Sequence, residues 1–154
     1  MILSEQIIES PIKSILDQLW EFYQEEKYHK NRIDKVEADK YHDKLIRTGN
    51  ILTVSEGNIL CGYVEIWRLN YEQLGRIICG EWFSAYLEDV QHGNIAWVGN
   101  TYIRPEYRKG EVYNMLKDRF REVTKDCRYY SGRAQRKSAW MIKMFKNRRY
   151  ENVR

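Results

Sequence analysis

The spacing of apolar residues predicts two helices in the first third of the chain. Ser10-Pro11 is a helix-start signal, and the apolar residues after it recur at helical spacing, which predicts a helix over about residues 11–26. The same spacing predicts a second, shorter helix over 36–47, with Tyr41 and Leu45 facing inward. The chain is therefore expected to begin with a helical pair.

Continuous apolar runs then replace the helical spacing and predict strands. Runs at 51–55 and 59–67 flank the hairpin signal Glu56-Gly57-Asn58. A later apolar run predicts a strand over 95–103. Residues 70–94 leave strand, helix and loop all open.

A strand–turn–helix unit in the second half is the most informative part of the chain. The strand at 95–103 is followed by a short basic turn, and apolar residues at helical spacing then predict a helix over 111–125. The first N–H groups of such a helix lack intrahelical partners, and its dipole places partial positive charge there. Arg108 and Lys109 add full charges. The unit therefore predicts a cradle for phosphate.

The rest of the pattern predicts a strand over 128–133 and a basic amphipathic helix that closes the chain. The predicted order is helix, helix, hairpin, strand, helix, strand, helix. Helices and strands that alternate in this way form an α/β fold. We expect a mixed, mostly antiparallel sheet flanked by helices.

The run from Ile103 to Leu116, IRPEYRKGEVYNML, resembles the acyl-coenzyme-A-binding motif of the GNAT superfamily of N-acetyltransferases. In that family a strand ends in a form such as V-x-P-x-Y-R, and a loop of form Gln/Arg-x-x-Gly-x-Gly/Ala opens a helix whose amides hold the coenzyme pyrophosphate. Gly110 takes the first glycine place and Val112 the second, and a one-residue gap lets Arg108 fill the Arg place. The order of elements over roughly residues 50–150 also resembles the family.

This resemblance implies a single GNAT-like domain over residues 1–154 that binds acetyl-CoA or another acyl-CoA as co-substrate. It implies transfer of the acyl group to an amine by direct attack in a ternary complex. The backbone of Tyr102 and Ile103 is expected to pair with the pantetheine arm. The residues expected around the pyrophosphate act through charge or through backbone amides: Arg108, Lys109, Gly110, Glu111, Val112 and Tyr113.

A second run, Ser138 to Tyr150 (SAWMIKMFKNRRY), resembles the last helix of GNAT proteins, which often reads Asn-x-x-Ala…Tyr-x-x-x-Gly-Phe. It adds Ser138 to the coenzyme-binding residues that the resemblance implies. Phe145 stands at the place of the tyrosine that frequently protonates the departing thiolate. A phenyl ring has no proton to give, so the resemblance assigns no acid here.

The general base is left open as well. Several GNAT enzymes carry a Glu at a place that falls on Ala96. Acyl transfer still needs a base for the proton of the amine. The candidate bases are Glu65 and Glu81, and also Asp89 and His92. The candidate acids are Tyr129 and Tyr130. For each of these residues, a surface or core role is the alternative.

Composition adds limits on class and location. The 154 residues are 43% hydrophobic and 31% charged, which fits one globular domain. No apolar run approaches a membrane span, and the start of the chain lacks signal-peptide features, so we expect a cytoplasmic protein without membrane contact. Three widely spaced cysteines indicate a reducing compartment. The three histidines lack ligand-like spacing, so no metal is expected, and a homodimer is left open.

Charge is distributed unevenly and suggests an anionic partner. Residues 1–100 hold 10 Lys/Arg and 16 Asp/Glu, a net of −6, whereas residues 101–154 hold 16 and 6, a net of +10. Coenzyme phosphates use only part of this charge, so nucleic acid is an alternative partner or substrate, with a solvated basic face as the remaining possibility. The basic residues considered for that role are Arg133, Arg136, Lys137, Lys143, Arg148 and Arg149.

Overall fold

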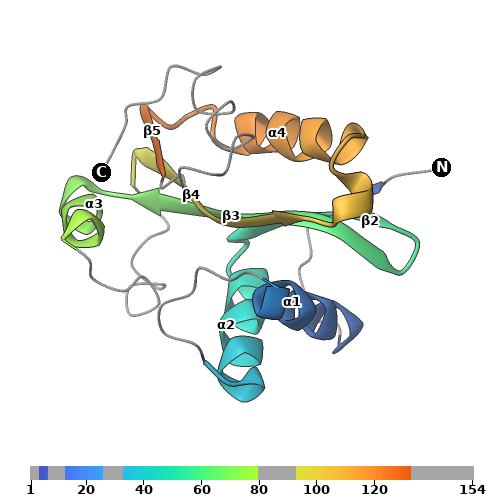
Figure 1. The fold of residues 1–154 in the computed structure, drawn as a ribbon. Coiled ribbons are helices and arrows are strands. Elements are labelled where there is room, and N and C mark those ends of the chain that lie inside the picture. Colours follow the sequence, from blue (N-terminus) through green and yellow to red (C-terminus); the bar gives the residue numbers. More distant parts are fainter. Residues whose placement is uncertain (1–3, 7–12, 26–32, 80–92, 133–154) are drawn as a thin grey trace. The chain divides into compact units, whose positions relative to one another are not determined.

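The computed structural model describes residues 4–6, 13–25, 33–79 and 93–132. The elements within these ranges are shown in Figure 1. In chain order they are β1 (Ser4–Gln6), α1 (Lys13–Glu25), α2 (Lys35–Arg47), β2 (Ile51–Glu56), β3 (Ile59–Leu69), α3 (Tyr71–Ile78), β4 (Ile95–Ile103), the 3-10 helix η2 (Pro105–Tyr107), α4 (Glu111–Val123) and β5 (Tyr129–Gly132).

The strands form one sheet in the order β1-β2-β3-β4-β5. β1 pairs antiparallel with β2, and β2 pairs antiparallel with β3. β4 and β5 are parallel, with Ile95 opposite Tyr129 and Val98 opposite Gly132. The combination of helices with a mixed sheet confirms the α/β fold that the sequence predicts.

By its contacts the chain divides into two compact units. The first comprises residues 1–65 and 101–116, and the second comprises 66–100 and 117–154. β3, β4 and α4 each run from one unit into the other. The basic turn between β4 and α4 belongs wholly to the first unit.

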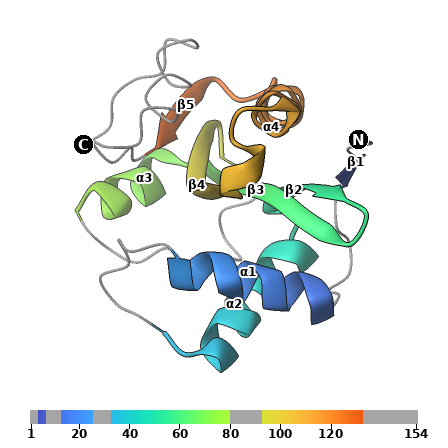
Figure 2. The same ribbon diagram turned by 45° about the vertical axis from the view of Figure 1, so that its right-hand side comes forward.

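Helices cover both faces of the sheet in the first unit. Phe22 of α1 stacks on Tyr63 of β3 with ring centroids 6.0 Å apart and an angle of 1° between the rings. The preceding residue, Gly62, faces the other way, because a Cβ built there would lie 3.2 Å from a side-chain carbon of Val112. Since successive strand residues point to opposite faces, α1 and the start of α4 lie on opposite faces (Figures 1 and 2).

Most of the elements predicted from the sequence are present. The two first helices, the hairpin, the strand at 95–103 and the helix after it all form within two residues of their predicted bounds wherever those bounds are described. Gly57 in the hairpin turn has a φ of 58°, in the left-handed region that glycine tolerates best. The predicted helix at the end of the chain lies outside the described residues.

The sequence did not predict β1 or α3. α3 begins at a capping box in which the Asn70 side chain accepts from the Gln73 amide at 2.8 Å and the Gln73 side chain accepts from the Asn70 amide at 2.9 Å. Gln73 and Ile77 are the buried residues of this short helix. Because one of the two buried positions is a polar glutamine, apolar residues do not recur at helical spacing in this segment. The sequence pattern therefore could not identify it as a helix.

A methyl group at Gly93 should destabilise the second unit. A Cβ built at Gly93 would lie 1.9 Å from the backbone oxygen of Leu69, so the backbone must shift to admit it. We expect Gly93→Ala to lower the free energy of unfolding by roughly 1–3 kcal/mol, the usual cost of overpacking, measured by urea denaturation. The control is Gly75→Ala on α3, where nothing lies within 4 Å of the added Cβ. That change should stabilise by up to about 1 kcal/mol, and equal effects of the two substitutions would contradict the close approach at Gly93.

Candidate functional site

The turn between β4 and α4 is built by short backbone hydrogen bonds. The amide of Tyr107 donates to the Arg104 oxygen at 2.9 Å, that of Arg108 to Pro105 at 3.3 Å, and that of Gly110 to Tyr107 at 3.4 Å. Pro105 favours the extended backbone seen at Arg104, where the strand ends. α4 then starts at Glu111, and helix geometry leaves its first N–H groups without intrahelical partners. Those amides and the positive end of the helix dipole open onto the turn.

Gly110 leaves this turn sterically open. The nearest atom to a Cβ built there is the Tyr107 backbone oxygen at 3.8 Å, an ordinary contact. The φ angle of Gly110 is outside the positive range, so any other amino acid could adopt the same backbone conformation at this position. Glycine is therefore not needed here for folding, and its effect is to leave space beside the start of α4.

The basic residues of the turn have different surroundings. The Arg104 side chain is turned inward: its Nε donates to the Leu60 oxygen at 2.7 Å and its Nη2 to Gln18 Oε1 at 3.0 Å. Arg108 is exposed, yet its Nε donates to the Ile103 oxygen at 2.8 Å. Lys109 is also exposed. The turn thus presents Lys109 and the outer guanidinium nitrogens of Arg108, whereas Arg104 fastens the turn to α1 and β3.

Tyr107 fastens the same turn to the β2–β3 hairpin. Its hydroxyl donates to Glu56 Oε2 at 2.9 Å, and this hydrogen bond raises the pKa of Tyr107 to about 12. The residues are 51 apart in the sequence, so local pattern could not reveal the pair. The hydrogen bonds of Tyr107 and Arg104 together hold the turn against the β2–β3 hairpin.

Tyr102 connects the end of β4 to the end of α1. Its ring lies 4.4 Å from that of Phe22, centroid to centroid, and the Arg108 guanidinium carbon lies 5.4 Å from the Tyr102 ring centre. Its hydroxyl donates to Glu25, the last residue of α1. Burial and this hydrogen bond raise the pKa of Tyr102 to about 12. The Tyr102 side chain is thus part of the core beneath the turn.

The other residues expected at the pyrophosphate lie at the start of α4. Glu111 is exposed, Tyr113 is half-buried, and Val112 is fully buried against β3 near Gly62. Ile103, at the end of β4, is buried as well. Val112 thus anchors the helix start to β3, while the Glu111 side chain remains exposed.

Of the candidate bases, Glu65 is the one that lies within the described residues. Its side chain is on β3 and only 2% exposed. The Tyr41 hydroxyl of α2 donates to Glu65 Oε2 at 2.9 Å. Glu65 shares its sheet face with Tyr63, two residues before it, which packs on α1. A buried carboxylate is rare unless it is paired or serves a function, and the Tyr41 hydroxyl is one such partner here.

Tyr129 and Tyr130 lie next to each other on β5 but in different surroundings. The Tyr130 ring lies 6.3 Å from the Phe120 ring, and its hydroxyl donates to the Thr124 oxygen at 2.9 Å. Tyr129 contacts Tyr71 and Arg128. Tyr130 thus joins the packing around α4, and Tyr129 faces a different group of residues.

Several predicted site residues lie outside the described residues. Ala96 is described, and it is fully buried on β4 with no carboxylate to offer. The predicted residues without a described position are Glu81, Asp89, His92, Arg133, Arg136, Lys137, Ser138, Lys143, Arg148 and Arg149.

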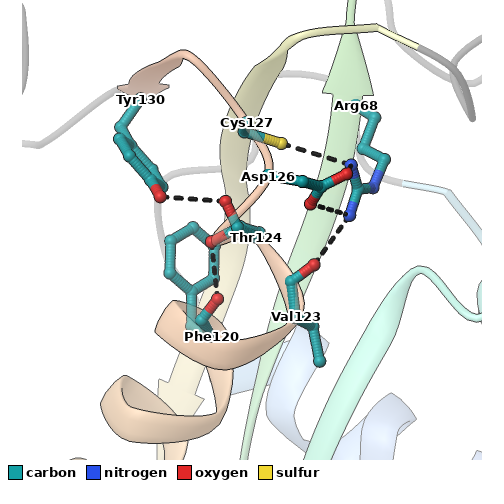
Figure 3. Close-up of polar contacts among 7 residues, drawn as sticks. All are labelled: Arg68, Phe120, Val123, Thr124, Asp126, Cys127 and Tyr130. Atoms are coloured by element: carbon teal, nitrogen blue, oxygen red, sulfur yellow. Dashed lines mark hydrogen bonds and ion pairs between the residues drawn. The ribbon is translucent and has the colours of Figure 1, made fainter.

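The C-terminal end of α4 is held by side chains from β3 and β5 (Figure 3). Arg68 Nη2 donates to the Val123 oxygen at 2.7 Å, and its two terminal nitrogens each lie 2.8 Å from an Asp126 carboxylate oxygen. This guanidinium holds the pKa of Asp126 below its usual range. Tyr130 donates to the Thr124 oxygen, so the carbonyls of Val123 and Thr124 both have side-chain partners, and Arg68 places a cation where the helix dipole favours one.

Removing the Arg68 side-chain contacts should loosen this end of α4. We expect Arg68→Met to lower the free energy of unfolding at neutral pH by about 1–3 kcal/mol, since it breaks hydrogen bonds to a carbonyl and a carboxylate. Because the pKa of Asp126 is lowered, the pair stabilises the fold above the ordinary carboxyl pKa of about 4 and loses its effect as pH falls through the lower folded value. The difference between wild type and variant should therefore shrink in acid, which denaturation at several pH values measures.

The matched control is Arg47→Met. Arg47 pairs with Asp43 at 2.8 Å, but its side chain is 65% exposed. Such surface pairs contribute at most about 1 kcal/mol. Two results would show that the Arg68 pair is not what holds the helix end. One is a loss of unfolding free energy in Arg47→Met as large as that in Arg68→Met. The other is a difference between wild type and Arg68→Met that stays the same in acid.

The described residues contain no group of three or more His, Cys, Asp or Glu side chains placed to hold a metal ion. None of their helices is long and apolar enough to cross a membrane.

Solved structures with the same fold include acetyltransferases. No family model matches the chain, and no curated protein sequence matches it either. A predicted acetyltransferase from Clostridium acetobutylicum, solved with acetyl-CoA, superposes with a TM-score of 0.63 at 11% identity, over 97% of this chain and 90% of that one. A possible acetyltransferase from Clostridium difficile 630 gives 0.57 at 12% identity, over 98% and 92%.

The aminoglycoside N-acetyltransferase AAC(6')-Iy, in complex with a coenzyme A bisubstrate analogue, gives a TM-score of 0.59 at 9% identity, over 100% of this chain and 94% of that one. At identities this low, the structural likeness establishes the fold but not the substrate. The likenesses nevertheless extend over nearly the whole of each chain. The chain therefore has the same fold as these acetyltransferases.

Proposed function

We propose that the protein is an acyl-CoA-dependent N-acyltransferase, with acetyl-CoA as the expected donor. The observation that carries this proposal is the turn between β4 and α4. It combines helix-start amides without intrahelical partners, exposed basic side chains and an open glycine, in the first unit of a fold shared with acetyltransferases. Structures of the same fold hold acetyl-CoA and a coenzyme A analogue, which supports the same ligand here.

In this proposal the coenzyme pyrophosphate lies at the start of α4. The amides of Glu111, Val112 and Tyr113 donate to phosphate oxygens, as helix-start amides commonly do. Lys109 and the outer nitrogens of Arg108 supply full positive charge. Gly110 lets the phosphates come close to the backbone. The backbone of Tyr102 and Ile103 lies just before this turn and is proposed to pair with the pantetheine arm.

The proposed reaction is a direct transfer. The nitrogen of a neutral amine attacks the thioester carbonyl carbon, the C–N bond forms, and the carbonyl oxygen becomes an oxyanion that a backbone amide can stabilise. The C–S bond then breaks, and coenzyme A leaves as a thiolate that takes up a proton. The amine proton passes to a base, either directly or through water.

Glu65 is the base that we propose. It is buried, and Tyr41 holds one of its carboxylate oxygens, so its orientation is fixed before the substrate arrives. It belongs to the first unit, as does the turn. The buried Ala96 offers no alternative carboxylate at the family's usual place.

The alternative to an acyltransferase is a binding protein that has the same fold but does not catalyse acyl transfer. The Ala96 and Phe145 replacements, which remove the family's usual base and acid, favour it. Release of thiol from acetyl-CoA separates the two, measured with polyamines, amino acids, peptides and nucleic acids as acceptors. Acceptor-dependent release supports the transferase. Coenzyme binding without release for any acceptor supports the binding protein.

A further inference from the structure

The second unit carries an exposed aromatic and cationic surface that the proposed transfer does not use. Tyr71, the first residue of α3, is 67% exposed. Its ring lies 6.0 Å from the Tyr129 ring, centroid to centroid, at an angle of 60°. The Arg128 guanidinium carbon lies 5.4 Å from the Tyr129 ring centre. We refer to these three residues as the Tyr71–Tyr129–Arg128 surface.

Backbone contacts hold both sides of this surface in place. Tyr71 follows Asn70, whose capping box with Gln73 fixes the start of α3. The amides of Arg128 and Tyr129 both donate to the Asn94 oxygen, at 2.9 and 3.2 Å. The rings and the guanidinium are therefore presented by a backbone that is ordered in advance, which reduces the entropy lost on binding.

Arg128 places one positive charge on this surface. The neighbouring acids are neutralised in ion pairs, Glu72 with Arg76 at 2.9 Å and Asp126 with Arg68 at 2.8 Å. Arg128 is exposed and pairs with no acid within the described ranges. The chain from 127 to 150 contains no acidic residue. A partner of negative charge is therefore favoured.

We propose that the Tyr71–Tyr129–Arg128 surface binds single-stranded nucleic acid. An unpaired base stacks on the exposed Tyr71 ring, and Arg128 contacts the adjacent phosphate. Stacking on tyrosine together with cationic contacts to the backbone is the usual mode of single-strand recognition. A duplex keeps its bases stacked on each other and offers no free base face. An acidic peptide satisfies Arg128 but has no flat ring for Tyr71. This proposal is independent of acyl transfer.

Fluorescence anisotropy with the full chain tests the proposal. The probes are a labelled 15-nucleotide oligo(dT), an oligo(U) of the same length, a DNA duplex and a poly-glutamate peptide, at about 50 mM salt and above. We expect the single strands to bind more tightly than the duplex. Tyr71→Ala should weaken single-strand binding about tenfold, and Tyr71→Phe should preserve it, because the ring provides the stacking energy. Arg128→Ala should lower the slope of log affinity against log salt by roughly one.

The control variant is Arg47→Ala, which removes one exposed positive charge from the first unit and should leave both affinity and slope unchanged. Melting curves confirm that each variant is folded. Four results would overturn the proposal: no single-strand binding at about 50 mM salt, tighter binding of the duplex, equal binding of poly-glutamate, or binding that Tyr71→Ala and Arg128→Ala leave intact. The last result would place the nucleic acid elsewhere on the chain.

Discussion

Gly110→Glu is expected to weaken coenzyme A binding by about 100-fold or more while leaving the fold unchanged. A carboxylate at this position projects into the open space beside the start of α4 and repels the pyrophosphate, and like charges placed together cost several kcal/mol. Folding should be unaffected, because the position is sterically open and its φ angle suits any residue. Isothermal titration calorimetry gives the affinity, and a melting curve gives the stability.

The matched control is Gly75→Glu. Gly75 lies on α3 in the second unit, and nothing lies within 4 Å of a Cβ built there. The same change in charge at that position should leave coenzyme A affinity unchanged. Wild-type affinity in Gly110→Glu would mean that the phosphates lie elsewhere. Equal losses in both variants would mean that net charge, and no local cradle, controls binding.

Glu65→Gln is expected to reduce kcat by about 100- to 10,000-fold, the usual contribution of general acid–base catalysis. Glutamine has nearly the same shape and can still accept from the Tyr41 hydroxyl, but it cannot take a proton from the amine. Coenzyme A affinity should stay within a few-fold of wild type. Steady-state kinetics with the acceptor found in the thiol-release screen provides kcat, and calorimetry provides the coenzyme affinity.

Two controls separate catalysis by Glu65 from a purely structural role. Glu72→Gln changes an exposed carboxylate on α3 and should leave kcat unchanged. The dependence of kcat on pH should lose its acidic limb in Glu65→Gln, because that limb reports protonation of the base. A variant that retains kcat within a few-fold, or the same acidic limb, would exclude Glu65 as the base.

Elements with a strong local period were predictable from the sequence. The hairpin, β4 and α4 each depend on apolar spacing and turn residues within a short stretch, and the structure confirms them. α3 was not predictable, because its inward face includes the polar residue Gln73. β1 is only three residues long, too short for a period to be recognised.

The parts of the site that join distant residues could not be predicted. The pattern showed Tyr41 facing inward and Glu65 on a strand, but not that the two meet across 24 residues. It also showed two arginines in the turn, Arg104 and Arg108, without separating their roles. Only the fold shows that Arg104 fastens the turn while Arg108 remains exposed. Side-chain partnerships of this kind depend on tertiary packing and leave no local period in the sequence.

Calorimetric titration of coenzyme A into wild-type protein, freed of copurified coenzyme, tests the central claim most directly. The cradle at the start of α4 predicts saturable binding with one coenzyme per chain, and affinity that falls as salt rises because charged phosphates are bound. Absence of binding at millimolar ligand would contradict the account, because the turn between β4 and α4 would then have no phosphate to hold.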